Sequence, residues 1–350
     1  MQEHEIRYSC QVALPGFGEA AQERLRTAKA LIVGVGGLGC PAAQYLVAAG
    51  VGTIGLADHD TISVSNLHRQ ILYAENEVGQ KKVTVAKKKL EAQNPHVRVN
   101  AHAVRASKET VLELISQYDL VLDATDNFST HYLLNDACVL AGKPMVHGAI
   151  YQYEGHVAVW NMLNEDGSRS PNYRDAFPEV NAMAIPDCAD GGVLPTIAGI
   201  IGTMQANETI KLITGAGDAL KGRILIFNAQ SMQSSIIKIG KTTKTTITSL
   251  GGSNNIQVIS KKELDVRDGI YLIDVRTDEE HSDFNIGGIN ISLDSIEDRW
   301  REIGDAKEIV FYCASGKRSA QAAKWLQDKM PGLIIYSLEG GINSLRVTQG

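Results

Sequence analysis

The chain has 350 residues, more than one average domain needs, and its 44% hydrophobic and 21% charged residues are typical of a globular protein. A net charge of −6 argues against nucleic acid or an anionic membrane as the main partner, because both attract basic surfaces. No apolar run approaches the ~20 residues that span a bilayer, and the N-terminus lacks the pattern of a signal peptide. We therefore expect a cytoplasmic protein of two domains.

Strands alternate with helices through the first 240 residues, which predicts a mainly parallel sheet with helices on its faces. The expected strands are residues 29–35, 53–57, 97–103 and 119–124, and the expected helices are 38–49, 81–93, 109–116 and 128–141. Residues 145–150 and 156–160 are expected to add a hairpin to this sheet. A helix of small and apolar residues at 193–213 and two closing strands at 224–227 and 235–239 complete the unit.

A segment rich in Thr, Gly, Ser and Asn, residues 240–255, has the composition of a linker. A second α/β pattern follows, with strands at 271–275, 309–312 and 333–336 and a helix at 319–330. We therefore predict a first domain at 1–245, a linker at 246–256 and a second domain at 257–350. The fold class is α/β, with a Rossmann-like, doubly wound, mainly parallel sheet and a smaller α/β domain.

The glycine-rich sequence GVGGLG follows the first expected strand and opens the first expected helix. Its glycines are Gly34, Gly36, Gly37 and Gly39. Glycines at such a turn let the backbone approach phosphate groups, whose charge the helix N-terminus favours. Asp58, at the end of the next strand, is placed to bind ribose hydroxyls. This pattern alone predicts a nucleotide and favours NAD, FAD and ATP about equally.

Polar side chains after later strands help to decide which of these three nucleotides is bound. They are Asn66, Arg69, Gln70, Lys82, Asp123 and Asp126. Ligands of parallel sheets bind beyond the carboxyl ends of the strands, so these groups are expected to converge. Arginine and lysine there suit a triphosphate and its leaving pyrophosphate, and a carboxylate suits Mg²⁺. A nicotinamide oxidoreductase is the alternative, although no hydride-transfer acid/base pair is identifiable.

Six motifs then occur in one order: RYSCQ (7–11), GVGGLG (34–39), DHDTISVSNLHRQ (58–70), VGQKK (78–82), LDATDN (122–127) and CADGGV (188–193). Over about residues 5–240 the chain resembles the adenylyltransferases that activate molybdopterin-synthase and thiamine sulfur carriers, relatives of ubiquitin-activating enzymes. The resemblance implies that ATP adenylylates the C-terminal carboxylate of a ubiquitin-like sulfur-carrier protein ending in Gly-Gly, with release of pyrophosphate. It also implies a homodimer.

The resemblance assigns roles to individual residues. Asp58 and Asn66 would hold the ribose, and Asp126 would hold Mg²⁺. The phosphates would be bound by Arg69, Gln70 and Lys82. Cys188 stands where relatives have a thiol that attacks the adenylate or resolves an acyl disulfide, with a purely structural role as the alternative.

Two positions depart from the family pattern. Cys10 replaces an arginine that in relatives reaches into the site of the partner subunit, so a regulatory homologue with impaired adenylation is a further alternative. Many relatives bind zinc through two Cys-x-x-Cys pairs. Here Asn172 and Asp175 hold the place of the first pair, and no second pair follows Phe227. We therefore expect no structural zinc.

The five cysteines are scattered and form no Cys-x-x-Cys pair, which excludes a disulfide framework. Cys40 and Cys138 have apolar neighbours at helical spacing and are expected in the core. Cys313 ends a strand and is followed by ASGKRS and a helix, so backbone N–H groups, Lys317 and Arg318 are expected to favour a nucleophilic thiolate.

The segments LIDVRTDEE (272–280) and SLEGGI (337–342) flank this cysteine in sequence. With them, residues from about 255 to 345 resemble a rhodanese domain. The resemblance implies a persulfide on Cys313 that converts the adenylylated carrier into a thiocarboxylate. The sulfur donor would be thiosulfate or a cysteine desulfurase, and the pathway served stays open.

Overall fold

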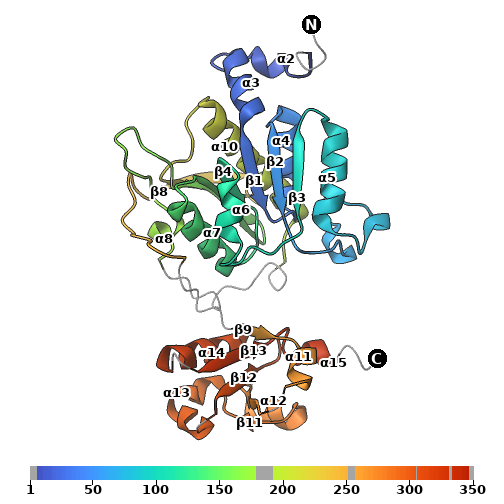
Figure 1. Cartoon of the computed structure of the whole chain (residues 1–350), viewed down its shortest axis with the longest axis vertical. Helices are drawn as coiled ribbons and strands as arrows, with labels where there is room; N and C mark the ends of the chain where they lie inside the picture. Colours follow the sequence, from blue (N-terminus) through green and yellow to red (C-terminus); the bar gives the residue numbers. More distant parts are fainter. Residues whose placement is uncertain are drawn as a thin grey trace. The chain divides into compact units, whose positions relative to one another are not determined.

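The computed structural model of the protein describes residues 6–178, 192–250, 257–267, 269–304, 306–330 and 333–346. The chain divides into two compact units, Met1–Gly251 and Gly252–Gly350. Each unit has its own sheet and its own hydrophobic core (Figure 1).

An eight-stranded sheet forms the centre of the first unit, in the order β3-β2-β1-β4-β5-β6-β7-β8. Its strands are β1 (Lys29–Val33), β2 (Thr53–Ala57), β3 (Arg98–His102), β4 (Leu120–Asp123), β5 (Met145–Tyr151), β6 (Glu154–Trp160), β7 (Arg223–Asn228) and β8 (Gln233–Lys238). The first five in chain order run parallel, and β6, β7 and β8 extend the sheet antiparallel. The predicted doubly wound, mainly parallel fold class is confirmed.

Helices cover both faces of this sheet (Figure 1). They are α2 (Ser9–Val12), α3 (Gly18–Thr27), α4 (Gly39–Ala49), α5 (Lys82–Gln93), α6 (Val111–Ser116), α7 (Phe128–Leu140), α8 (Tyr173–Ala176) and α10 (Pro195–Thr214), with 3-10 turns η1 (Val64–Asn66) and η2 (Glu75–Glu77). Successive side chains of β1 enter different cores, because neighbouring residues of a strand point to opposite faces. Ile32 packs with α4, α5 and α10, whereas Leu31 packs with α6 and α7.

Local sequence explains where several of these helices begin and end. The Asn127 side chain caps α7 by accepting a hydrogen bond from the backbone N–H of Thr130. Pro195 stands in the first turn of α10, where its missing N–H has no cost, and Gly215 ends that helix with a left-handed φ of 70°. The strand expected at 29–35 stops at Val33 because Gly34 turns the chain with φ of 89°.

The second unit is a five-stranded, all-parallel sheet in the order β11-β10-β12-β13-β9. Its strands are β9 (Gln257–Ile259), β10 (Tyr271–Asp274), β11 (Ile289–Asn290), β12 (Glu308–Tyr312) and β13 (Ile334–Leu338). Its helices are α11 (Lys261–Asp265), α12 (Asp278–Asp283), α13 (Ile296–Arg299), α14 (Lys317–Lys329) and α15 (Asn343–Arg346), with 3-10 turns η3 (Leu293–Ser295) and η4 (Trp300–Ile303). Within the described residues, we find no helix with the length and apolar character needed to cross a membrane.

Candidate functional site

The strand order reverses between β1 and β4, which is the position where parallel sheets of this kind bind ligands. The chain leaves β1 toward β2 on one side and returns to β4 on the other. The loops after the two strands lie side by side, because the Ala124 N–H donates a hydrogen bond to the Val33 carbonyl at 2.9 Å. The glycine loop and the loop that carries Asp126 therefore share one edge of the sheet.

Two of the four glycines have no space for a side chain. A Cβ at Gly34 would lie 2.6 Å from the Ala124 carbonyl oxygen, and one at Gly39 would lie 2.0 Å from the Gly34 carbonyl oxygen. The other two glycines face side chains. A Cβ at Gly36 would lie 3.4 Å from Gln70 Nε2, and one at Gly37 would lie 3.5 Å from Arg69 Cγ. The structure thus brings the glycine loop together with Arg69 and Gln70, as expected for a phosphate site.

Asp58 supports the glycine loop. Its Oδ2 accepts a hydrogen bond from the Val35 N–H and its Oδ1 accepts one from the Asp60 N–H, both at 2.8 Å. The carboxylate therefore ties the end of β2 to the turn after β1, a role that the motif alone did not indicate. Its contact with a ribose stays a prediction.

Lys82 begins α5 with its side chain only 6% exposed and its ammonium 2.9 Å from Asp60 Oδ2. Burial would raise the pKa of Asp60, but the hydrogen bond and charge of Lys82 hold it below its ordinary value. Gln70 is also buried, and its Oε1 has no hydrogen-bond partner among the described residues. A buried polar atom left unpaired is costly, so Gln70 fits a position that a ligand completes.

Three other predicted residues are exposed or partly exposed. Asp126 is exposed in the loop between β4 and α7, and Asn66 is partly exposed in η1. Cys10 is exposed on α2, and the Arg7 guanidinium donates to the Gln93 carbonyl at 3.3 Å. Cys188 lies outside the described residues.

The prediction that Cys40 and Cys138 belong to the core is confirmed, because both are fully buried on α4 and α7. Burial raises the pKa of Cys40 to about 12 and raises that of Cys138 as well. Neither thiol is suited to nucleophilic chemistry at neutral pH.

A network of one buried carboxylate, two buried histidines and the half-buried His156 follows the end of β4. Asp123 Oδ2 accepts hydrogen bonds from Nδ1 of His131 at 2.7 Å and Nδ1 of His147 at 3.0 Å, while its Oδ1 accepts one from the Thr125 hydroxyl at 2.7 Å. His147 and His156 approach through their Nε2 atoms at 3.4 Å. The ligand atoms of Asp123, His131 and His147 are close enough for a metal ion, but each is already paired by hydrogen bonds.

Burial sets the protonation of this network. Burial would raise the pKa of Asp123, but the histidines hold it well below its usual range. Burial lowers the pKa of His147, and burial with the neighbouring histidines lowers that of His156 to about 3. Sequence reasoning missed these histidines, although His147 and His156 are conspicuous in otherwise apolar strands.

The place of the first cysteine pair is taken by a hydrogen-bonded cluster. The Asp175 carboxylate accepts from the Thr243 hydroxyl at 2.7 Å and from the N–H groups of Lys244 and Thr245 at 2.9 Å each. The Asn172 amide donates to the Thr243 hydroxyl at 2.8 Å. Asp175 is the one side chain here of a type that binds zinc, and its oxygens are engaged, so these residues do not fit a structural zinc site.

In the second unit, two segments distant in sequence meet at Cys313. The Cys313 thiol is buried at the end of β12, and its Sγ accepts a hydrogen bond from the Gly316 N–H at 3.1 Å. The Ser319 hydroxyl lies 3.5 Å from the same sulfur. The Ile342 N–H donates to the Cys313 carbonyl at 2.9 Å, which brings the SLEGGI segment against the loop.

Arg318, which was expected to favour a thiolate at Cys313, is paired with a carboxylate. Its guanidinium forms two hydrogen bonds with the Glu280 carboxylate of α12, at 2.6 and 2.7 Å. Sequence reasoning could not see this pair, because the two residues are 38 positions apart.

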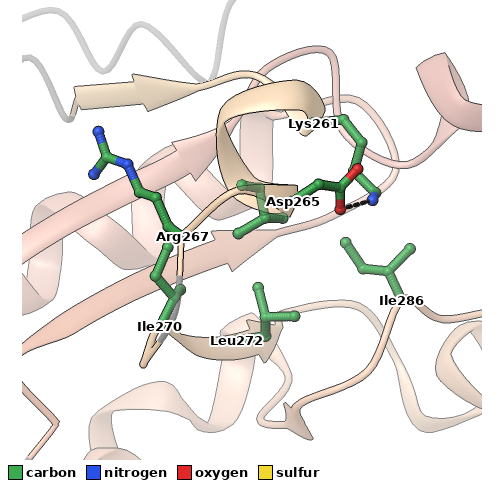
Figure 2. Close-up of a pocket in the computed structure, with 7 residues that line it drawn as sticks. Lys261, Asp265, Arg267, Ile270, Leu272 and Ile286 are labelled. Atoms are coloured by element: carbon green, nitrogen blue, oxygen red, sulfur yellow. Dashed lines mark hydrogen bonds and ion pairs between the residues drawn. The ribbon is translucent and has the colours of Figure 1, made fainter.

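A cavity of about 500 Å³ lies elsewhere in this unit, between α11 and the start of β10 (Figure 2). Figure 2 shows the ion pair of Lys261 and Asp265 on one side of it and Arg267 on the other. Its apolar lining includes Ile270 and Leu272. Cys313 does not line this cavity, so the cavity is separate from the sulfur site.

Comparison with known proteins identifies both units. Residues 8–248 match the model of the ThiF family, and residues 258–347 match that of the rhodanese-like domain. A "Sulfur carrier protein adenylyltransferase" of Thermus thermophilus is 49% identical over 224 residues, which cover 64% of this chain and 83% of that protein.

Two relatives match both units. The "Probable adenylyltransferase/sulfurtransferase MoeZ" of Mycobacterium tuberculosis is 39% identical and covers 91% of this chain and 87% of its own. The "Adenylyltransferase and sulfurtransferase MOCS3" of Drosophila grimshawi is 37% identical and covers 97% of this chain and 83% of its own. Among solved structures, MccB of E. coli aligns with a TM-score of 0.61 at 20% identity, over 71% of this chain and 73% of that one, which shows a shared fold.

Because burial keeps His147 and His156 unprotonated, we expect the first unit to lose folding stability in acid. The folded state keeps His147 and His156 unprotonated, whereas the unfolded chain takes up protons near pH 6.5, so stability falls as the pH drops from 7.5 to 5.5. Each histidine adds a slope of at most ~1.4 kcal/mol per pH unit. His156→Gln should flatten this slope, measured by urea unfolding through Trp160 fluorescence with Trp300 and Trp325 replaced by phenylalanine.

Replacing the exposed His96 by glutamine is the matched control and should leave the slope unchanged. An equal slope for wild type and His156→Gln would show that His156 is protonated alike in the folded and unfolded states.

Proposed function

The chain belongs to the ThiF family and carries a C-terminal rhodanese-like domain, and from this premise we propose that it adenylylates the C-terminal glycine of a ubiquitin-like sulfur-carrier protein and then delivers sulfur to it. It is an adenylyltransferase with a sulfurtransferase domain. The observation that carries the proposal is the packing of the glycine loop against Arg69 and Gln70 where the strand order reverses. The second reactive centre, Cys313, stands in the same chain.

The first step would use this site of the first unit. The glycine loop and the N-terminus of α4 favour phosphate charge, Asp58 and Asn66 would bind the ribose, and Arg69, Gln70 and Lys82 would bind the phosphates. A carboxylate oxygen of the carrier forms a bond to the α-phosphorus as the bond to the bridging oxygen of the β-phosphate breaks, and pyrophosphate leaves. Asp126 would hold Mg²⁺, which when bound offsets phosphate charge.

The second step would use the loop of Cys313. The outer sulfur of a Cys313 persulfide attacks the acyl carbon, AMP leaves, and an acyl disulfide forms. A second thiol then attacks the Cys313 sulfur, which frees the carrier thiocarboxylate and leaves a protein disulfide for a cellular thiol to reduce. We assign that second thiol to Cys188.

The partners and cofactors of the proposed reaction follow from the resemblance. The partners would be a carrier ending in Gly-Gly, a sulfur donor such as thiosulfate or a cysteine desulfurase, and a second copy of the chain. The cofactors would be ATP and Mg²⁺, without structural zinc, since the cluster of Asn172, Asp175, Thr243 and Thr245 is held by hydrogen bonds.

Asp126→Ala should reduce carrier-dependent exchange of pyrophosphate into ATP by roughly 100-fold or more, because a carboxylate that positions Mg²⁺ acts directly on phosphoryl charge. Asp126 is exposed, so the circular dichroism and thermal midpoint of the variant should match wild type. The exposed Asp166 offers a control, and Asp166→Ala should exchange at the wild-type rate. Exchange by Asp126→Ala at that rate would refute the metal role.

Cys313→Ala should retain pyrophosphate exchange but lose thiocarboxylate formation, because adenylylation needs no group of the second unit whereas sulfur delivery needs its nucleophile. The product is measured by mass spectrometry of the carrier, as a sulfur-for-oxygen gain. The conservative Cys138→Ala alters a buried thiol on α7 of the first unit and serves as the control. Thiocarboxylate formed by Cys313→Ala as fast as by wild type would leave the second unit as a docking module.

Metal analysis of the purified, untagged chain should find less than ~0.1 zinc per chain, since a closed structural site needs four N, S or O ligands. Chelator treatment should leave the thermal midpoint unchanged. Tightly held zinc at one per chain that is lost in Asp175→Asn would show that the cluster binds metal after all.

A further inference from the structure

The loop that holds Cys313 contains one guanidinium, and a carboxylate from another element already occupies it. Arg318 Nη1 donates to Glu280 Oε2 at 2.6 Å, and Nη2 donates to Glu280 Oε1 at 2.7 Å. This two-point geometry is the strongest arrangement between these side chains, although both are about 35% exposed. The group that would be expected to attract an anionic sulfur donor is therefore engaged.

Glu280 is held in place by its own helix as well. It lies in the first turn of α12, where its Oε2 also accepts a hydrogen bond from the Thr277 N–H at 3.1 Å. The hydrogen bond from Arg318 lowers the pKa of Glu280 to about 2, so the carboxylate carries its full charge at neutral pH. The pair is thus anchored at both ends rather than formed by two mobile surface chains.

Other charged groups lie near this pair. The Asp274 carboxylate acts on Arg318 together with Glu280. Asp274 is itself engaged, because Arg276 is buried against it at 2.6 Å and His281 donates to it at 2.9 Å. Lys317, the first residue of α14, carries a charge of the opposite sign. A small anion that approaches Arg318 therefore meets the Glu280 carboxylate on the guanidinium itself.

We propose that Glu280 is a specificity-determining residue of sulfur loading, which disfavours donors in proportion to their negative charge. The unit would accept sulfur from a persulfide on a protein or small thiol in preference to dianionic thiosulfate. The inference rests on the proposed function, since it concerns how Cys313 acquires its persulfide.

The chemistry is the same for each donor. The Cys313 thiolate attacks the sulfane sulfur and forms a new S–S bond, while the donor's own S–S bond breaks. The leaving group departs with the electron pair: sulfite from thiosulfate, methanesulfinate from methanethiosulfonate, or a thiolate from a persulfide. Donors therefore differ in the charge that they bring to Arg318 and in their leaving group. The effect of the leaving group is the same in wild type and in each variant.

The experiment compares thiosulfate, a dianion, with methanethiosulfonate, a monoanion that transfers the same sulfane sulfur. Loading of the full chain is followed as thiocyanate formed with cyanide, and kcat/KM is measured for each donor. Glu280→Gln keeps the acceptor for the Thr277 N–H but removes the charge. We expect kcat/KM to rise ~10-fold for thiosulfate and ~3-fold for methanethiosulfonate, in keeping with one like charge at short range.

The ratio of the two donors isolates donor charge from any change in thiol reactivity. It should rise about threefold in Glu280→Gln and stay near wild type in Glu280→Asp, which keeps the charge. Asp278→Asn and Glu279→Gln remove neighbouring charges that do not pair with Arg318, and each should change the ratio by less than ~1.5-fold. An unchanged or lower ratio in Glu280→Gln overturns the inference.

Wild type gives an independent readout that does not depend on the folding of a variant. Because salt screens repulsion, its thiosulfate-to-methanethiosulfonate ratio should rise between ~0.02 and ~0.5 M ionic strength. A ratio that falls with salt would show net attraction of the dianion and refute the proposal. Loading by wild type from none of the donors would refute the proposed sulfur transfer itself, whereas loading with an unaltered ratio refutes the role of Glu280 alone.

Discussion

The proposed nucleotide site depends on how closely the backbone after β1 approaches the backbone after β4. A side chain at Gly34 would collide with the Ala124 carbonyl at 2.6 Å, and one at Gly39 would collide with Gly34 itself at 2.0 Å. The absence of these Cβ atoms lets α4 begin immediately beyond the sheet, with its N-terminus toward the proposed site. Asp58 then holds the turn through the Val35 N–H, so the proposed phosphate site is shaped mainly by main-chain contacts.

Most strands and helices of the first unit were predictable from sequence, whereas several elements of the second unit were not. Residues 53–57 form the expected strand at its expected limits, and α7 begins at the expected Phe128. Among the elements that were not predicted, β9, β11, α11 and α12 have two to six residues, too few for a hydrophobic period to appear. The ten-residue α3 was missed as well, with only two of its residues buried. The capping boxes of α11 and α12 were nonetheless visible, as Ser260 with Glu263 and Thr277 with Glu280.

The candidate sites show a different limit of sequence reasoning. Motif position identified Asp58, Lys82 and Arg318 as residues of interest, but it did not reveal their partners. Lys82 pairs with Asp60, 22 positions away, and Arg318 pairs with Glu280, 38 positions away. A charge that is paired attracts a ligand less than a free one does, so the partner decides the chemistry as much as the charge itself.

The cluster around Asp175 is a polar network that joins two segments distant in sequence. Several donors from residues 243–245 converge on one carboxylate, and hydrogen bonds to a charged group contribute roughly 1.5–3 kcal/mol each when buried, less when partly exposed as here. Burial would raise the pKa of Asp175, but these bonds hold it below its ordinary value. A carboxylate with a depressed pKa stabilises the fold above the pKa of the unfolded chain and ceases to do so as the pH falls through the folded value. We therefore expect attachment of this segment to weaken as the pH falls through the folded-state pKa of Asp175.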